Sequence, residues 1–105
     1  MSLFDRQEKK TINEAINIVR TTKNAVLVDV RSKEDYDKHH VAGAISIPYN
    51  RLDLAEHRIR SKDLLVYVYG SYYHKPRAIV KKLRKTGFTN IHACGYFEEH
   101  NVNPS

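Results

Sequence analysis

Two short apolar runs, residues 25–30 and 64–68, stand out from the polar sequence around them. Apolar residues fill nearly every position in both runs rather than every second position, which is typical of strands that are covered on both faces. Two weaker segments, residues 45–47 and 89–93, predict further short strands. The first of these ends at Pro48, which cannot continue a strand.

The segments between these runs carry apolar residues at helical spacing and have recognisable helix ends. Thr11 and Glu14 fit a capping box. Ser32 and Asn50 are suited to cap two further helices, and Pro76 is suited to open a fourth. The predicted helices span residues 12–20, 33–39, 51–59 and 76–85, with a last helical turn over 95–100.

The alternation of strands and helices predicts a single α/β domain over residues 1–105, with a mainly parallel sheet. Ligands of such sheets bind beyond the carboxyl ends of the strands. Arg31, the loop over 69–75 and Cys94 each follow a predicted strand, so we expect them on one rim of the molecule.

The loop after residue 68 leads into a helix that opens on proline, an arrangement in which backbone N–H groups converge and favour an anion. We expect Tyr67 to pack in the sheet. The loop tyrosines either contact a partner or pack over the loop, and His74 is either solvated or a ligand of the anion. The predicted cradle comprises Tyr69, Gly70, Ser71, Tyr72, Tyr73, His74, Lys75 and Arg77.

The chain has 105 residues, a hydrophobic share of 41% and a formal net charge of +6, which suit one small basic domain. Much of the basic charge lies on and beside the predicted helix 76–85. It is compatible with a solvated surface, with a small anion or an acidic protein partner, and with a polyanion such as nucleic acid. Nucleic acid is the least favoured of these, because no motif that reads bases accompanies the charge.

Cys94 is the single cysteine, so an internal disulfide and a multi-cysteine zinc site are both excluded. The histidines are scattered, and we expect neither a metal nor a cofactor. The sequence has no apolar run long enough to span a membrane, and its first ten residues lack the apolar core of a signal peptide. A cytoplasmic protein is therefore expected.

Residues 28–48 resemble the signature of the rhodanese-like family. The family pattern is Asp-Val-Arg, an acidic residue before an aromatic one, Gly-His-Ile-x-Gly-Ala, and a short strand ending in proline. Only His39 departs from it, where the family has glycine. The resemblance implies a three-layer sandwich in which helices flank a mainly parallel sheet of about five strands. Its signature positions are Asp29, Arg31, Asp35, His40 and Gly43.

These positions also have a physical interpretation as structural residues. Arg31 and Asp35 are four residues apart, so they can pair on one helical face. Asp29, at a strand end, can accept hydrogen bonds from nearby backbone N–H groups. Gly43 is suited to a backbone conformation that other residues avoid.

The resemblance implies sulfur transfer by a loop cysteine that carries a persulfide. Aligned on the strand, that cysteine falls at Val68, and the loop then counts about two extra residues. A second cysteine found in some relatives would fall near Tyr73. Phosphatases of this fold use the motif Cys-x5-Arg. In this chain, Val68 stands at the position of that cysteine and His74 at the position of that arginine. We therefore expect an inactive binding or regulatory module, with a sulfur carrier acting through Cys94 as the alternative.

Overall fold

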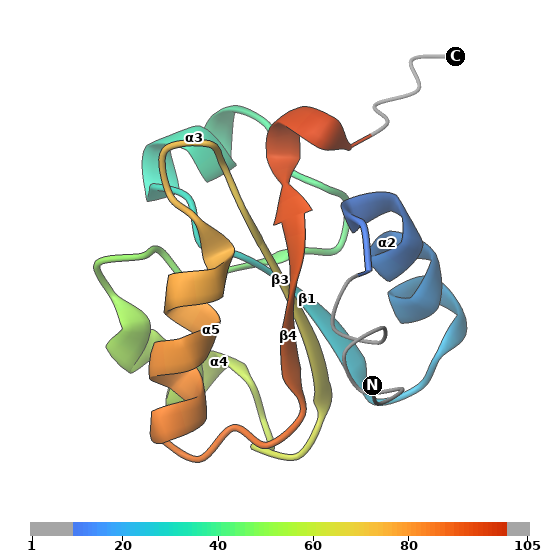
Figure 1. Cartoon of the computed structure of the whole chain (residues 1–105), viewed down its shortest axis with the longest axis vertical. Helices are drawn as coiled ribbons and strands as arrows, with labels where there is room; N and C mark the ends of the chain where they lie inside the picture. Colours follow the sequence, from blue (N-terminus) through green and yellow to red (C-terminus); the bar gives the residue numbers. More distant parts are fainter. Residues whose placement is uncertain (1–9, 101–105) are drawn as a thin grey trace, which may run out of the picture.

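The computed structural model describes residues 10–100 of the chain (Figure 1). Residues 1–9 and 101–105, which the predicted single domain includes, lie outside this description. The elements in chain order are α2 (Ile12–Thr21), β1 (Ala25–Asp29), α3 (Lys33–Lys38), β2 (Ile45–Ser46), the 3₁₀ turn η1 (Leu52–Leu54), α4 (Ala55–Arg58), β3 (Leu65–Gly70), α5 (Pro76–Lys85), β4 (Ile91–Tyr96) and the 3₁₀ turn η2 (Phe97–Glu99).

The sheet has the strand order β2-β1-β3-β4, and every pair of neighbours is parallel. The predicted α/β fold with a parallel sheet flanked by helices is confirmed. The sequence predicted about five strands, and the described residues form four.

Helices cover both faces of the sheet (Figure 1), and the buried side chains form one apolar core on each face. In the first cluster, strand residues such as Val28, Val66 and Val68 pack with Ile79 and Leu83 of α5. In the second cluster, Leu27, Tyr67, Tyr69 and Cys94 pack with Ile12 and Ala15 of α2. Alternate residues of one strand thus enter opposite cores, which explains why the runs are apolar at nearly every position.

The best-predicted helices are those with local end signals. The Thr11 hydroxyl oxygen accepts from the amide of Glu14 at 3.1 Å, and the Glu14 carboxylate accepts from the amide of Thr11 at 2.9 Å. Helix α5 has the predicted bounds and is followed by Gly87, whose φ is +106°. The Ser32 hydroxyl caps α3 by accepting from the amide of Asp35 at 3.1 Å.

The predicted helix over residues 51–59 is wrong in its first half. The chain forms η1 and only then the short α4, and Asn50 does not cap either element. The amide of Tyr49 donates to the carbonyl of Val30, and the amide of Arg51 donates to the carbonyl of Pro48. The amides of Leu54 and Ala55 then donate to the carbonyls of Arg51 and Leu52, three residues back, so the first half of the segment forms a 3₁₀ turn in place of an α-helix.

Strands β3 and β4 each extend beyond their predicted ends. Val68 pairs with Ala93, but Tyr69 pairs with Gly95, so Cys94 is an extra residue that bulges out of the ladder. After this bulge, pairing resumes and continues to Gly70 and Tyr96. Tyr69 and Gly70 therefore belong to the strand and not, as predicted, to the loop.

Candidate functional site

The carboxyl end of β3 opens into a loop of five residues, 71–75, that leads to α5. The sequence placed Val68, the position aligned with the family's cysteine, at the end of the strand directly before the loop. The strand instead continues for two more residues, so Val68 lies inside it with no exposed surface and packs in the first cluster. The two apparently extra loop residues are the last two residues of β3.

Gly70 is the residue from which the loop departs, and the loop closes tightly over it. A Cβ atom at Gly70 would overlap the carbonyl oxygen of His74 and come within 3.0 Å of Cδ of Pro76. The His74 carbonyl is held in that place because it accepts a hydrogen bond from the amide of Ser71 at 3.0 Å. In this loop conformation, the end of β3 has no room for a side chain.

Three amides of the loop donate to two side chains of the protein itself. The Ser71 hydroxyl oxygen accepts from the amides of Tyr73 at 3.2 Å and His74 at 3.0 Å. The amide of Tyr72 donates to both carboxylate oxygens of Glu98, each at 3.3 Å. An external anion would have to displace the hydroxyl or the carboxylate to reach these three N–H groups.

The first turn of α5 lies next to these amides and has no side-chain cap. Its N-cap residue is Lys75, and no side chain accepts a hydrogen bond from the first turn. Pro76, the first helical residue, carries no N–H group. The positive end of the helix dipole therefore lies beside the loop without an acidic residue in the turn that follows.

The loop tyrosines lie on the surface, whereas Tyr69 is fully buried. Tyr73 is 89% exposed and Tyr72 is 54% exposed. The ring of Tyr72 meets that of Tyr96 edge to face with centroids 4.9 Å apart, so it does not fold over the loop. The prediction that Tyr69 is a loop residue is wrong, while the prediction that Tyr67 packs in the sheet is confirmed.

His74 is the loop residue that stacks inward, onto Tyr49 from the turn after β2. The two rings lie 4.0 Å apart at an interplanar angle of 18°. Nδ1 of His74 is buried and has no hydrogen-bond partner among the described residues. The loop is thus supported from the side by an aromatic stack.

Beneath the loop, Tyr69 joins a buried polar network with Asp29 and Arg31. The Tyr69 hydroxyl donates to Asp29 Oδ2 at 2.6 Å and accepts from the amide of Val41 at 3.1 Å. Burial, strengthened by the nearby Asp29 carboxylate, raises the pKa of Tyr69. The phenol therefore stays protonated at neutral pH and fixes the strand end.

The predicted pairing of Arg31 with Asp35 is wrong. Arg31 Nε and Nη2 donate to Asp29, with Nη2 at 2.8 Å from Oδ2, and Nη2 also donates to the carbonyl of His39. The guanidinium carbon lies 3.9 Å from the ring centroid of Phe97. Arg31 precedes α3 rather than lying on it, so the four-residue spacing does not place it beside Asp35.

The remaining signature residues have structural roles. The Asp29 carboxylate accepts from the amide of Arg31 at 2.8 Å, as expected for a carboxylate at a strand end. The ring of His40 stacks on Tyr36 at 3.7 Å, and its Nδ1 lies 2.7 Å from the Tyr36 carbonyl oxygen. Gly43 has a φ of +87°, the backbone conformation that glycine adopts without strain.

Cys94 lies inside β4, and not beyond the strand on the rim where the sequence placed it. Its side chain is in the second cluster, and Sγ donates to the carbonyl of Val68 at 3.4 Å. Burial raises the pKa of the Cys94 thiol to about 12. The thiol is therefore protonated at neutral pH, and it is separated from solvent by the apolar core.

The basic residues predicted beside the loop form an exposed stripe along α5. The helix contains no acidic residue. Among the described residues, none of the ion pairs involves the exposed side chains of Lys75, Arg77, Lys81, Lys82 or Lys85. Their positive charge is therefore available to a partner.

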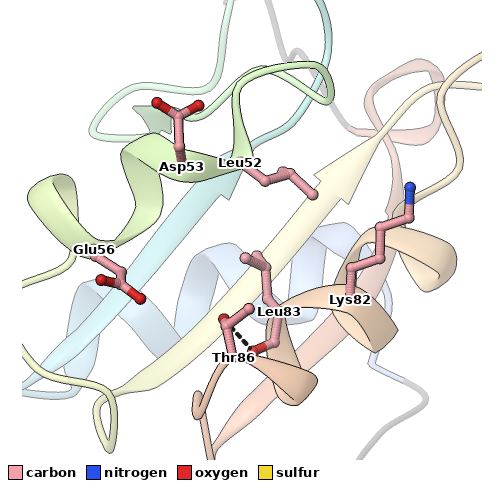
Figure 2. A pocket seen from close by; sticks show the side chains of 6 residues that line it. All are labelled: Leu52, Asp53, Glu56, Lys82, Leu83 and Thr86. Atoms are coloured by element: carbon pink, nitrogen blue, oxygen red, sulfur yellow. Dashed lines mark hydrogen bonds between the residues drawn. The ribbon is translucent and has the colours of Figure 1, made fainter.

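A pocket of about 330 Å³ lies away from the loop, between η1–α4 and the carboxyl half of α5 (Figure 2). Leu52 and Leu83 supply its apolar surface, and Lys82 stands on one wall. The carboxylates on the opposite wall already have partners, because Asp53 pairs with Arg51 and Glu56 with Lys62. This hollow does not include the strand end where the chemistry of the fold was expected.

Two residues that shape the loop were missed from the sequence. Glu98 comes from η2 and Tyr49 from the turn after β2, and both reach the loop only through the folded chain. Ser71 was recognised as a cradle residue but not as the hydroxyl on which the amides converge. Neither Glu98 nor Tyr49 carries a local signal that would have indicated these contacts.

Residues 10–100 contain neither a membrane-spanning helix nor a cluster of metal ligands. No helix in that range is long and apolar enough to cross a bilayer. The same range holds no cluster of three or more histidine, cysteine or acidic side chains arranged to bind a metal ion.

Comparison with known proteins agrees with this architecture. A family model described as the rhodanese-like domain matches residues 11–97. An uncharacterised protein of Buchnera aphidicola subsp. Schizaphis graminum is 32% identical over 106 residues, covering 91% of this chain and 64% of the relative. The adenylyltransferase and sulfurtransferase uba4 of Ogataea parapolymorpha is 34% identical over 64 residues, covering 61% of this chain and 16% of the relative.

A solved structure, a rhodanese with anions from E. coli, superposes with a TM-score of 0.66 and 26% identity, covering 72% of this chain and 91% of that chain. The alignments span less than two thirds of the length of the two curated relatives. The match of the family model over most of the chain shows that this chain belongs to the rhodanese-like domain family and is related to sulfurtransferases.

Proposed function

We propose that this domain is a non-catalytic member of its family and serves as a binding or regulatory module. The observation that carries the proposal is the closed end of β3. The loop starts at Gly70, whose Cβ position is filled by the His74 carbonyl, and residues 70–77 include no cysteine. Sulfur transfer of the family type needs a thiolate at this place.

The position of Cys94 supports the proposal. A sulfur carrier must be deprotonated to attack a sulfane donor and accessible to pass the sulfur on. Cys94 is 1% exposed, and burial raises its pKa to about 12. The thiol therefore lacks both properties in the folded domain.

The loop itself also favours binding over turnover. Its amides donate to Ser71 and Glu98, and its two tyrosines are exposed to solvent. Exposed tyrosines contribute large contact areas at low entropic cost. An anion-binding role of the same amides remains a prediction, since such an anion would compete with these internal acceptors.

The proposal is tested by assaying the purified domain with thiosulfate and cyanide, beside a cysteine-bearing rhodanese. We expect no thiocyanate above the protein-free rate and no adduct of about 32 Da, the mass of one sulfur atom, on the intact chain. Iodoacetamide at pH 8 should label Cys94 only after denaturation by urea. Thiocyanate formation that disappears in Cys94→Ala would contradict the proposal.

A further inference from the structure

The loop and α5 together present exposed aromatic rings next to Arg77 and Lys81, which form no ion pair within the described part of the chain. Tyr73 extends into solvent at the head of α5, and Tyr72 lies beside it in the loop. Arg77 is in the first turn of the helix, and Lys81 is one turn further along the same face. Tyrosine and arginine are, with tryptophan, the side chains enriched at the energetic centre of protein interfaces.

The opposite side of the same surface carries negative charge. Glu98 and Glu99 lie in η2, which is at the same end of the sheet as the loop (Figure 1). The Glu98 carboxylate is exposed while it accepts from the amide of Tyr72, and the ring of Tyr72 contacts Tyr96 just before η2. The surface thus has basic side chains on α5, aromatic side chains on the loop and acidic side chains on η2.

Resting on the proposed function, we propose that this surface docks an acidic segment of a partner protein, with apolar side chains over the tyrosines. We call it the loop face and define it by Tyr72, Tyr73, Lys75, Arg77 and Lys81, with Glu98 at its edge. Acidic residues of the partner lie along α5, where Lys75, Arg77 and Lys81 form no ion pair within residues 10–100. Apolar residues of the partner cover the Tyr72 and Tyr73 rings, which removes their exposed area from water.

The mixed charge distinguishes a protein segment from nucleic acid. A single-stranded nucleic acid also combines stacking on aromatic rings with attraction to basic residues. Its backbone, however, carries a negative charge at every nucleotide, and at the η2 side it would meet the carboxylates of Glu98 and Glu99. A protein segment can present acidic residues to α5 and uncharged residues to η2.

The test measures binding by fluorescence anisotropy with three labelled probes. The first is a peptide with a run of glutamates followed by leucine and phenylalanine. The second is the same peptide with lysines in place of the glutamates, and the third is single-stranded oligothymidylate. We expect the first probe to bind the domain more tightly than the other two.

Matched variants locate the site. Tyr73→Ala and Arg77→Glu should each raise the Kd of the acidic peptide about tenfold, a typical effect of truncating a central interface residue. Tyr73→Phe keeps the ring and should retain the affinity. Lys23→Glu makes the same charge change as Arg77→Glu in the turn before β1, at the opposite end of the strands, and it should change the Kd by less than about twofold.

Three results would overturn the inference: no saturable binding of the acidic peptide, tighter binding of oligothymidylate, or an equal loss of affinity in Lys23→Glu. Circular dichroism checks that each variant is folded. The same samples are assayed for thiocyanate, so that the two proposals fail separately. Thiocyanate formation together with binding of the acidic peptide would refute the non-catalytic function alone. Absence of peptide binding without thiocyanate formation would refute only the docking at the loop face.

Discussion

At the scale of the residue, Gly70 decides what the end of β3 can carry. The φ of Gly70 is not positive, so its glycine identity is not required by backbone conformation. The requirement is steric, because the His74 carbonyl and the Pro76 ring occupy the space of a side chain. A thiol at this residue therefore needs a different loop, and not only a different amino acid.

This geometry predicts the outcome of single cysteine substitutions. Gly70→Cys should lower the free energy of unfolding by about 2 kcal/mol, as expected when atoms are forced into a filled space. Val68→Cys, a small change in the core, should cost less than about 1.5 kcal/mol. Urea denaturation followed by circular dichroism measures both values. Neither variant should form thiocyanate, and efficient turnover by Gly70→Cys would show that the loop opens readily.

Individual residues differ in how far the sequence predicts their contacts. Asp29 and Gly43 were predicted correctly, because a carboxylate at a strand end and a glycine in a bend act on their own backbone. The partner of Arg31 was predicted wrongly. The backbone is extended at Ser32, whose ψ is 155°, so Arg31 lies before the helix and pairs with Asp29 instead of Asp35. The partner of Tyr69 is 40 positions away along the chain, beyond the reach of any local pattern.

At the scale of the element, the ends of strands were harder to predict than their centres. The centre of β3 is marked by consecutive apolar residues, but its end is set by pairing with β4. The bulge at Cys94 shifts the register between Val68 and Tyr69 and lets Gly70 pair with Tyr96. Since the loop was counted from the predicted strand end, this error made the predicted loop two residues too long.

The contact between η2 and the loop gives a second prediction. The amide of Tyr72 donates to the exposed Glu98 carboxylate at 3.3 Å, whereas the amide of His74 donates to the hydroxyl of the buried Ser71 at 3.0 Å. In Glu98→Ala, the Tyr72 amide should exchange with solvent several-fold faster in NMR hydrogen-exchange measurements. The His74 amide serves as the internal control and should keep its rate. Equal acceleration of both amides would mean that Glu98 orders the whole loop.

At the scale of the whole molecule, one sheet serves two cores. The same central strands, β1 and β3, send alternate residues into the first cluster under α5 and the second cluster under α2. The apolar runs predicted this arrangement, since a strand exposed on one face would alternate. What the runs could not predict is which loops meet at the carboxyl end, because that depends on strand order and on side chains from η2 and the turn after β2.

The shared sheet predicts that the two cores unfold together. Leu83→Ala removes side-chain atoms from the first cluster and Leu27→Ala from the second, and each should lower the free energy of unfolding by about 3 kcal/mol. The two side chains lie on opposite faces, so the losses should add to within about 0.5 kcal/mol in the double variant. Circular dichroism and tyrosine fluorescence should report one coincident urea transition, as for a two-state domain. The exposed Lys23→Ala should leave that transition nearly unchanged. Separate transitions in Leu27→Ala would instead show that α2 can detach while α5 keeps the loop face in place.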